Sequence, residues 1–487
     1  MRRARAVLPA AAILCMGGLI FLGQWDFAWL IALGTAAIVP LMRSLEMTAG
    51  EERVGVLPAV LVLIAPSVRW ISLPVSRTYA TGQTLLPILA VGVLLAYART
   101  ASAPVWGRFR GHARPLGRPL LLLAAAVLLS QIASGDILRP VDLITSPFSV
   151  AFVLGGLAFY ALGCLAGDTA LLRERVLEAG MVMGLLQAAV VLDQATGGIV
   201  GIGAALGAPA AVSGYVAGLL GDGELTSELL VIMLIWSLSL AVWGGTGRRR
   251  LLGTACSLVY LIGCLAMSHR SAFLGAIGAL AAIALLGMAG RADRAKGKAA
   301  VAVLAVLLVF GLFWVSFSQV QALPDSVLGR MATQGIGQTD MLNRGVVYAT
   351  AISLAPQVPV TGFGIGVVDQ LNAAGQTQYI STHSLWLWAG LSAGIVGLAA
   401  CVWLFGGAFT ISLREWRHSP SAATAALFAT SVFLIIDQSK IDYVRIPVYA
   451  YFLMGVLGLV SSLGGGVNDP SDHGGLAALA ADGVAKP

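Results

Sequence analysis

The sequence predicts an all-α integral membrane protein with about 12–14 transmembrane helices and one long extracytoplasmic loop. Hydrophobic residues make up 58% of the 487 residues and charged residues only 11%, which is more apolar than a soluble core of this length can bury. Apolar runs long enough to cross a bilayer recur along the chain. Basic residues gather in alternate connections between these runs, as expected when successive segments cross in opposite directions.

The candidate membrane spans are apolar runs of roughly 17–25 residues with few charges. In chain order they cover residues 7–23, 27–42, 54–71, 82–98, 118–134, 148–166, 178–194, 225–243, 250–267, 271–289, 299–317, 384–411, 422–437 and 446–463. The first is expected to be an uncleaved anchor, because a second apolar run follows almost at once. The run at 384–411 is long enough to begin as a tilted or interfacial helix.

We expect residues 1–463 to form a single polytopic membrane domain and residues 464–487 to form a disordered cytoplasmic tail. The tail is rich in Gly, Asp and Ala, a composition that cannot fill a core. The chain shows no internal repeat of the kind that builds two-halved transporters.

The positions of Lys and Arg predict the orientation, because basic residues close to a span are retained in the cytoplasm. With the N-terminus inside, the inner connections hold the basic clusters at 2–5, 43–53, 99–118, 173–175, 248–250, 291–298 and 414–417. The opposite connections are sparse in basic residues, so the loop at 318–382 is expected outside the cytoplasm. The net charge of +7 is explained by this topology, and nothing indicates nucleic-acid binding.

The cysteines and acidic residues do not suggest a metal site. All five cysteines lie inside apolar spans without a CxxC pair, and we expect buried thiols rather than disulfides or ligands: Cys15, Cys164, Cys256, Cys264 and Cys401. The 318–382 loop has no Asp-x-Asp pair and no group of His, Cys, Asp or Glu at ligand spacing.

The 318–382 loop is much longer than its neighbours, and a functional surface is most often built on such a loop. Apolar residues at helical spacing predict an amphipathic helix near 341–355, which Pro356 and Pro359 end. Three glycines then permit a tight turn: Gly362, Gly364 and Gly366. This "GFGIG" run lacks the GxGxxG spacing and the preceding strand of a nucleotide-binding loop.

Ionisable residues at span ends are candidate functional residues, because placing a charge in the bilayer centre costs roughly 2.5–3.5 kcal/mol on insertion scales. His269 and Arg270 occupy a short turn between two spans, Arg344 lies near the start of the loop helix, and His383 directly precedes a span. Taken singly, these residues have ordinary interpretations as a headgroup anchor, a solvated helix start and an interfacial histidine.

Together on one membrane face, the same residues suit a lipid-linked sugar diphosphate. Two guanidinium groups can hold a diphosphate through paired hydrogen bonds and offset charge as it leaves. A histidine near neutral pH can take the proton of an attacking hydroxyl.

Three blocks resemble the O-antigen ligase and O-antigen polymerase superfamily of polytopic bacterial membrane proteins. They are the Ser-x-Arg turn in "SHRSAFLGAIGAL" (268–280), the arginine-led helix and Gly-rich turn in "NRGVVYATAISLAPQVPVTGFGIG" (343–366), and the His-Ser block in "THSLWLWAGLSAGIVGL" (382–398). The resemblance covers roughly residues 250–410, in the order of the superfamily. The N-terminal half matches in hydropathy alone.

The resemblance implies a metal-independent glycosyltransferase without a cofactor. It would move a glycan from undecaprenyl pyrophosphate to a hydroxyl of the lipid A core or of a growing polysaccharide, at the periplasmic face of the bacterial inner membrane. By this resemblance His383 is the general base, and Arg270 and Arg344 engage the diphosphate. His269, in the variable middle of the Ser-x-Arg turn, and Asp437, in an outer connection, are candidate supporting residues.

Several assignments stay open at this point. Ligases and polymerases share these motifs. A lipid-linked glycan flippase or polysaccharide exporter would bind the same diphosphate without needing His383, and a relative that glycosylates protein or builds another envelope polymer is a third alternative. The roles of Tyr215 and Glu228 are undetermined, and Asp442 is an alternative to Asp437 as the acidic partner.

Overall fold

The computed structural model describes thirteen stretches of the chain. They are residues 55–69, 72–75, 78–100, 103–134, 150–206, 208, 216–267, 276–278, 280–284, 348–349, 351–364, 384–437 and 447–465. The predicted spans at 7–23, 27–42 and 299–317, most of the span at 271–289, and the tail beyond Gly465 lie outside these residues.

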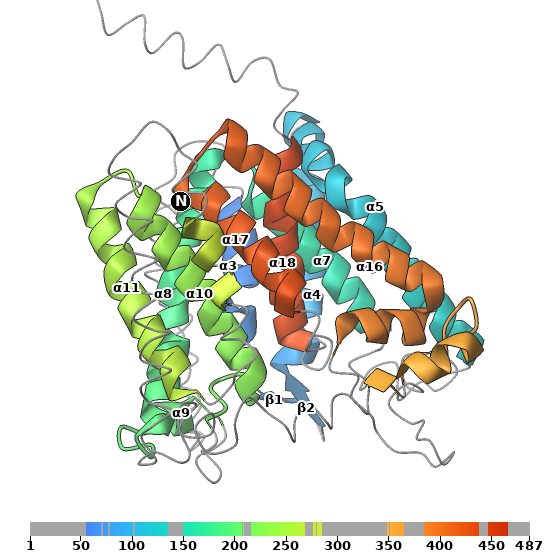
Figure 1. The fold of residues 1–487 in the computed structure, drawn as a ribbon, viewed down its shortest axis with the longest axis horizontal. Helices are drawn as coiled ribbons and strands as arrows, with labels where there is room; N and C mark the ends of the chain where they lie inside the picture. The colour runs from blue at the N-terminus through green and yellow to red at the C-terminus, as the bar shows by residue number, and fades with distance from the viewer. Residues whose placement is uncertain are drawn as a thin grey trace, which may run out of the picture.

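The described residues form a bundle of long helices that run roughly alongside one another (Figure 1). The helices are α3 (Val56–Ile64) continued by η2 (Ala65–Ser67), α4 (Gly82–Thr100), α5 (Ala103–Ser134), α7 (Val150–Ala166), α8 (Ala170–Ala195), α9 (Ile202–Ala205), α10 (Gly223–Trp243), α11 (Gly247–Ala266), η4 (Ala355–Gln357), α16 (Leu385–His418), α17 (Ala422–Asp437) and α18 (Pro447–Gly465).

Within the described part of the chain, six helices are long and apolar enough to cross a membrane: α5, α8, α10, α11, α16 and α18. Four shorter apolar helical segments lie among them, in α3 with η2, α4, α7 and α17. The predicted all-α multispanning fold is confirmed.

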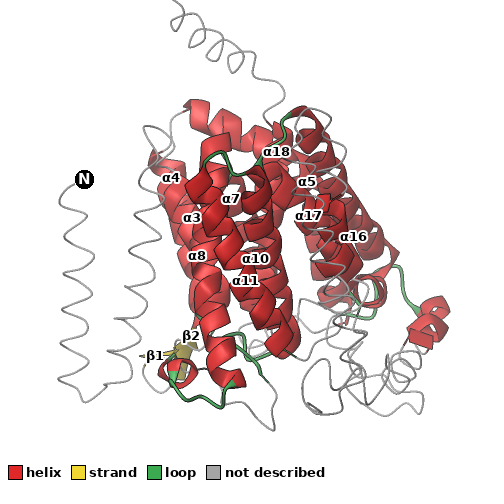
Figure 2. Ribbon diagram, turned by 60° about the vertical axis from the view of Figure 1, so that its left-hand side comes forward, coloured by secondary structure: helices red, strands yellow, loops and turns green. Residues whose placement is uncertain are grey.

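A small β-hairpin contains the only strands in the described residues, and it was not predicted. Strand β1 (Ser72–Val75) pairs antiparallel with β2 (Thr78–Thr81), with Ser72 opposite Thr81 (Figure 2). The span predicted at 54–71 therefore ends earlier, at Ser67. Four-residue strands are too short to show a periodic pattern against the long apolar runs on either side.

Two helices begin well before the apolar runs that predicted them. Helix α5 starts at Ala103 rather than near 118, and α8 starts at Ala170 rather than near 178, where the Thr169 side chain accepts a hydrogen bond from the Leu172 amide. Hydropathy predicts the part of a helix that crosses hydrocarbon, whereas backbone hydrogen bonding continues into the polar zone.

The bundle is held together by close helix contacts at small residues. A Cβ atom at Gly163 of α7 would overlap the backbone of Gly455 in α18, so this pair of glycines lets the two helices touch. Between α10 and α17, the Trp236 indole donates a hydrogen bond of 3.1 Å to the Thr430 hydroxyl. A buried tryptophan with a satisfied donor fixes the register of these two helices.

One end of the bundle, which we call the basic end, carries ion pairs between neighbouring helices. Arg249 at the start of α11 lies 2.6 Å from Glu174 and 2.6 Å from Glu178 of α8. Arg108 of α5 lies 3.2 Å from Asp168, which follows α7. The hairpin, α9 and the start of α10 lie at the opposite end (Figure 1).

Asp168 is the most densely paired carboxylate at the basic end. His112 Nε2 lies 3.2 Å from one of its oxygens, and Arg108 Nε lies 3.2 Å from both. Burial alone would raise the pKa of Asp168, but the contacts with His112 and Arg108 outweigh it and hold the pKa below its ordinary value. This cluster joins the start of α5 to the α7–α8 turn.

Candidate functional site

The predicted site residues are only partly described. His269, Arg270, Arg344 and His383 lie outside the described residues, so their predicted roles stay predictions. Asp437 is described and is fully buried at the last position of α17. The site is therefore built from the elements that flank the four undescribed residues: the end of α11, the segment 351–364 and the start of α16.

Helix α16 is bent, a feature that was not predicted from the sequence. Gly394 has φ 68° and ψ −169°, which breaks the helix into a short first part, Leu385–Ala393, and a long second part that crosses the bundle (Figure 1). The Ser384 side chain caps the first part by accepting a hydrogen bond from the Leu387 amide. His383 is the residue immediately before this cap.

The segment 351–364 fastens the bend of α16. The amide of Phe363 donates a 2.8 Å hydrogen bond to the carbonyl of Leu391, and the amide of Gly364 donates a 3.2 Å hydrogen bond to the carbonyl of Ser392. The Ser130 hydroxyl of α5 also donates to the Ser392 carbonyl. These donors satisfy carbonyl groups that lose their helical partners at the break. We call this arrangement the bend lock.

Glycine is required at both sides of the bend lock. Gly362 has φ 83°, and a Cβ atom there would overlap the backbone of Ser392. A Cβ atom at Gly394 would overlap the carbonyl of Val360 in the same way. Since only glycine tolerates the positive φ and the contact together, part of the "GFGIG" run has a structural role in holding α16.

The predicted loop helix is present where it is described. Residues 348–349 and 351–354 are helical, and the 3₁₀ turn η4, with Pro356 inside it, follows directly. Ala351 and Leu391 are buried against each other in a small apolar cluster with Phe363. The end of this helix therefore packs on the first part of α16.

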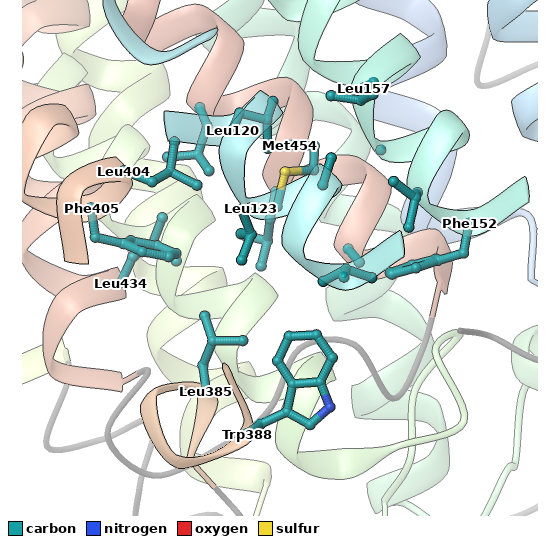
Figure 3. Close-up of a pocket in the computed structure, with 17 residues that line it drawn as sticks. Leu120, Leu123, Phe152, Leu157, Leu385, Trp388, Leu404, Phe405, Leu434 and Met454 are labelled. Atoms are coloured by element: carbon teal, nitrogen blue, oxygen red, sulfur yellow. The ribbon is translucent and has the colours of Figure 1, made fainter. Parts of the chain in front are cut away.

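An apolar cavity of about 100 Å³ lies beside the first part of α16 (Figure 3). Five helices supply its walls: α5 with Leu120, Leu123, Ala124 and Val127; α7 with Phe152, Val153, Gly156 and Leu157; α16 with Leu385, Trp388, Leu404 and Phe405; α17 with Leu434; and α18 with Ala450, Leu453, Met454 and Leu457. Among the described residues, no charged side chain lines the cavity.

Three polar side chains meet inside the bundle near the start of α10, the end of α17 and the start of α18. Glu228, Asp437 and Tyr449 are fully buried, and the carboxyl of Glu228 lies close to that of Asp437 and to the Tyr449 hydroxyl. We call these residues the acidic cluster. Leu434, about one helical turn before Asp437, lines the apolar cavity, so the cavity and the acidic cluster lie about one turn apart along α17.

Polar side chains order the segment that leads into α10. Gln187 and Gln194 of α8 accept hydrogen bonds from the amides of residues 217–219, and Gln187 donates to the Pro66 carbonyl. Arg69 donates to the Leu220 carbonyl. Burial lowers the pKa of the Arg69 guanidinium, and the nearby charge of Asp222 opposes that shift. These contacts fix the start of the helix that carries Glu228.

The described residues contain no group of three or more His, Cys, Asp or Glu side chains that could hold a metal ion. Cys164, Cys256 and Cys401 are free, buried thiols and Cys264 is a free, partly buried one, whereas Cys15 lies outside the described residues.

Sequence reasoning missed the cavity and left Glu228 unassigned. The cavity walls come largely from α5, α7 and α18, where single apolar residues look alike in sequence. Glu228 carried one usable signal, because it is a carboxylate inside an apolar run, and such residues are functional candidates. Tyr215, the other unassigned residue, lies outside the described residues.

Comparison with known families identifies one matching region. Residues 255–402 match the family model described as O-Antigen ligase. The match covers less than half of the chain, and it includes all three sequence blocks, His269, Arg270, Arg344, His383 and the bent start of α16. The resemblance to the O-antigen ligase and polymerase superfamily is thereby confirmed. No curated protein matches the chain.

Proposed function

We propose that this multi-pass membrane protein is a glycosyltransferase of the O-antigen ligase or polymerase type. It moves a glycan from undecaprenyl pyrophosphate to an acceptor hydroxyl, on lipid A core or on a growing polysaccharide, at the periplasmic face of the bacterial inner membrane. The observation that carries the proposal is the family match over 255–402, because it contains the three blocks and every basic residue proposed for the site.

The proposed reaction is a single displacement at the sugar. The acceptor oxygen attacks the anomeric carbon, the bond from that carbon to the diphosphate oxygen breaks, and its electron pair leaves with the diphosphate. His383 takes the acceptor proton, and Arg270 and Arg344 offset the charge that develops on the leaving group. The products are the glycosylated acceptor, with inverted configuration at the anomeric carbon, and undecaprenyl pyrophosphate.

The described geometry supports this proposal in two ways. The bend lock fixes the start of α16, so a residue next to Ser384 is attached to a rigid element, as a general base requires. The start of a helix also presents free amide groups and a partial positive charge, which favours an anionic group nearby. The apolar cavity adjoins the same helix start.

The test is glycan transfer by the purified protein in proteoliposomes, with a lipid-linked donor and a defined acceptor. His383→Ala is expected to reduce the transfer rate by about 10²–10⁴-fold. Donor binding should stay within a few-fold, since the arginines remain. His418→Ala is the matched control, because His418 is exposed at the far end of the same helix.

Transfer at the wild-type rate by His383→Ala would overturn the proposed role of this histidine. If, in addition, the wild-type protein moves the lipid-linked donor across the bilayer but never forms a glycosidic bond, the exporter alternative replaces the glycosyltransferase.

A further inference from the structure

Among the described residues, the walls of the apolar cavity differ in exposure. Its α16 and α17 wall residues are buried, whereas Leu123 of α5, most of the α7 wall and Met454 of α18 are partly exposed. The mouth therefore lies beside α5 and α7.

The surface around that mouth is apolar as well. Leu121 of α5 is 60% exposed and Leu154 of α7 is 52% exposed, and both adjoin residues that line the cavity. Helix α5 is long and apolar enough to cross a membrane, and α7 is a shorter apolar helix packed beside it, so these exposed side chains are placed to face the hydrocarbon of the bilayer. The cavity is thus continuous with a lipid-facing surface, and a membrane lipid can enter it sideways without crossing water.

The outer edge of the cavity carries one buried hydrogen-bond donor. Trp388 is 6% exposed, and its indole Nε1 has no hydrogen-bond partner among the described residues. Figure 3 shows that this nitrogen lies on the side of the ring away from Leu404 and Phe405. A buried indole N–H usually finds a partner, so the position is suited to an oxygen atom just beyond the apolar space.

We infer that the cavity binds the isoprenoid chain of the glycan donor, entering between α5 and α7, with the Trp388 indole donating to the first oxygen that follows the chain. This inference rests on the proposed function, which supplies a lipid-linked donor. The described residues that line the cavity carry no charge that could neutralise a diphosphate, so these walls suit only the hydrocarbon part.

The position of Trp388 in α16 indicates which part of the isoprenoid chain is bound. Trp388 lies one helical turn after Ser384, the cap next to the proposed base, so the chain segment at the cavity is the one nearest the diphosphate. An apolar cavity of roughly 150 Å³ accepts a benzene-sized guest. The volume here, about 100 Å³, fits the five carbons of a single isoprene unit.

Two variants and a matched control probe the cavity. A Cβ atom at Gly156 would meet Met454 at 3.6 Å, an ordinary contact, so Gly156→Leu is expected to fold and to fill the cavity. Gly92→Leu adds the same side chain on α4, where a Cβ atom meets nothing within 4 Å. Trp388→Phe keeps an aromatic ring and removes only the indole donor.

The experiment is photo-crosslinking of the full-length protein in nanodiscs with a diazirine-bearing isoprenoid phosphate and, in a parallel arm, a diazirine-bearing diacyl phospholipid. The isoprenoid probe is expected to label peptides of α5, α7, α16 or α18. Gly156→Leu should lower the labelling at least tenfold, Gly92→Leu should leave it unchanged, and Trp388→Phe should weaken probe affinity by about two- to tenfold.

The readout is independent of glycan transfer. Equal labelling by the phospholipid probe, or unchanged isoprenoid labelling in Gly156→Leu, would overturn the cavity assignment. His383→Ala should keep full labelling while losing transfer, since it removes the chemistry alone. Strong, cavity-dependent isoprenoid labelling without any glycan transfer by the wild-type protein would support the cavity assignment and count against the proposed function.

Discussion

The carboxyl groups of Glu228 in α10 and Asp437 in α17 face each other inside the bundle, and neither side chain is exposed. The two residues lie 209 positions apart in the chain, and Tyr449 of α18 completes the group. Two ionised carboxylates in such surroundings would repel each other, because a low dielectric strengthens the interaction of like charges.

Glu228→Gln is expected to leave the free energy of unfolding unchanged or to raise it by up to about 1 kcal/mol, since the amide keeps the shape and removes one like charge. Glu228→Ala should lower it by about 1–3 kcal/mol, because the neighbouring polar groups lose a partner. Unfolding in detergent measures both variants. If Glu228→Gln lowers the free energy of unfolding as much as Glu228→Ala does, repulsion between the two carboxyl groups is not significant in the acidic cluster.

The bend lock predicts strong effects at two glycines. Gly362→Ala and Gly394→Ala should each lower stability by about 1–3 kcal/mol, because a Cβ atom at a positive φ also overlaps backbone across the bend. Glycan transfer should fall with them, since the start of α16 shifts. Gly390→Ala is the control, because its Cβ atom would meet Leu398 at 3.7 Å, an ordinary contact. Equal glycan-transfer rates in all three variants would show that transfer does not depend on the bend lock.

Asp168 predicts a pH dependence of stability at the basic end. The pKa of Asp168 is lower in the folded state than its value of 3.8 in the unfolded chain. The carboxylate therefore stabilises the fold at pH values above 3.8, and this stabilisation is lost as pH falls through the pKa of the folded state. Asp168→Asn should lower the free energy of unfolding by about 1 kcal/mol at neutral pH. The difference from wild type should shrink below about pH 4. A difference that persists at lower pH would mean that the carboxylate charge does not act through Arg108 and His112.

The helices were predictable because a membrane span is a local property of the sequence. The span at 422–437 matches α17 and that at 446–463 lies within two residues of α18, since each is a single apolar run bounded by polar residues. The length of the 384–411 run predicted a tilted or interfacial start for this helix, but not the bend near the start of α16. Gly394 as the break point was not predicted either, because the contact with Val360 that requires glycine is non-local.

The candidate site was only partly predictable, for the same physical reason. Arg270, Arg344 and His383 were proposed as site residues because a charged or titratable side chain beside a span is unusual and because the blocks around them resemble a family, and these assignments stay predictions. The cavity gave no such signal, because Gly156, Leu385 and Leu453 are ordinary residues for a membrane helix. Which apolar residues enclose a space depends on how five helices pack, and hydropathy does not carry that information.

The orientation of the chain can be tested directly. Thr377→Cys is expected to react with a membrane-impermeant thiol reagent in intact spheroplasts, because the distribution of basic residues predicts that the 318–382 loop is outside the cytoplasm. A cysteine in place of Thr246, which caps α11 beside Arg248–Arg250, is the control for the cytoplasmic side and should react only after lysis. The reverse pattern would overturn both the orientation and the periplasmic site.

The proposed role of Arg270 and Arg344 predicts that a positive charge alone is insufficient for glycan transfer. Arg270→Lys and Arg344→Lys keep the positive charge and lose the planar fork that grips a diphosphate, so the transfer rate should fall at matched expression. Each Arg→Ala variant should lose at least about tenfold, because a hydrogen bond to a charged group contributes about 1.5–3 kcal/mol. The double variant should lose less than the product of the two, since both act on one leaving group.

Lysine at these positions also distinguishes a diphosphate clamp from a lipid anchor. An arginine that only reaches a phospholipid headgroup can be replaced freely, because lysine extends to the same depth with the same charge. Arg248→Lys, at an exposed position on α11, should retain full transfer and serves as the control for expression and folding. Transfer rates near wild type in both Arg270→Lys and Arg344→Lys would remove the clamp from the mechanism. His383 would then have no held leaving group to act against, and the general-base assignment would fail with the clamp.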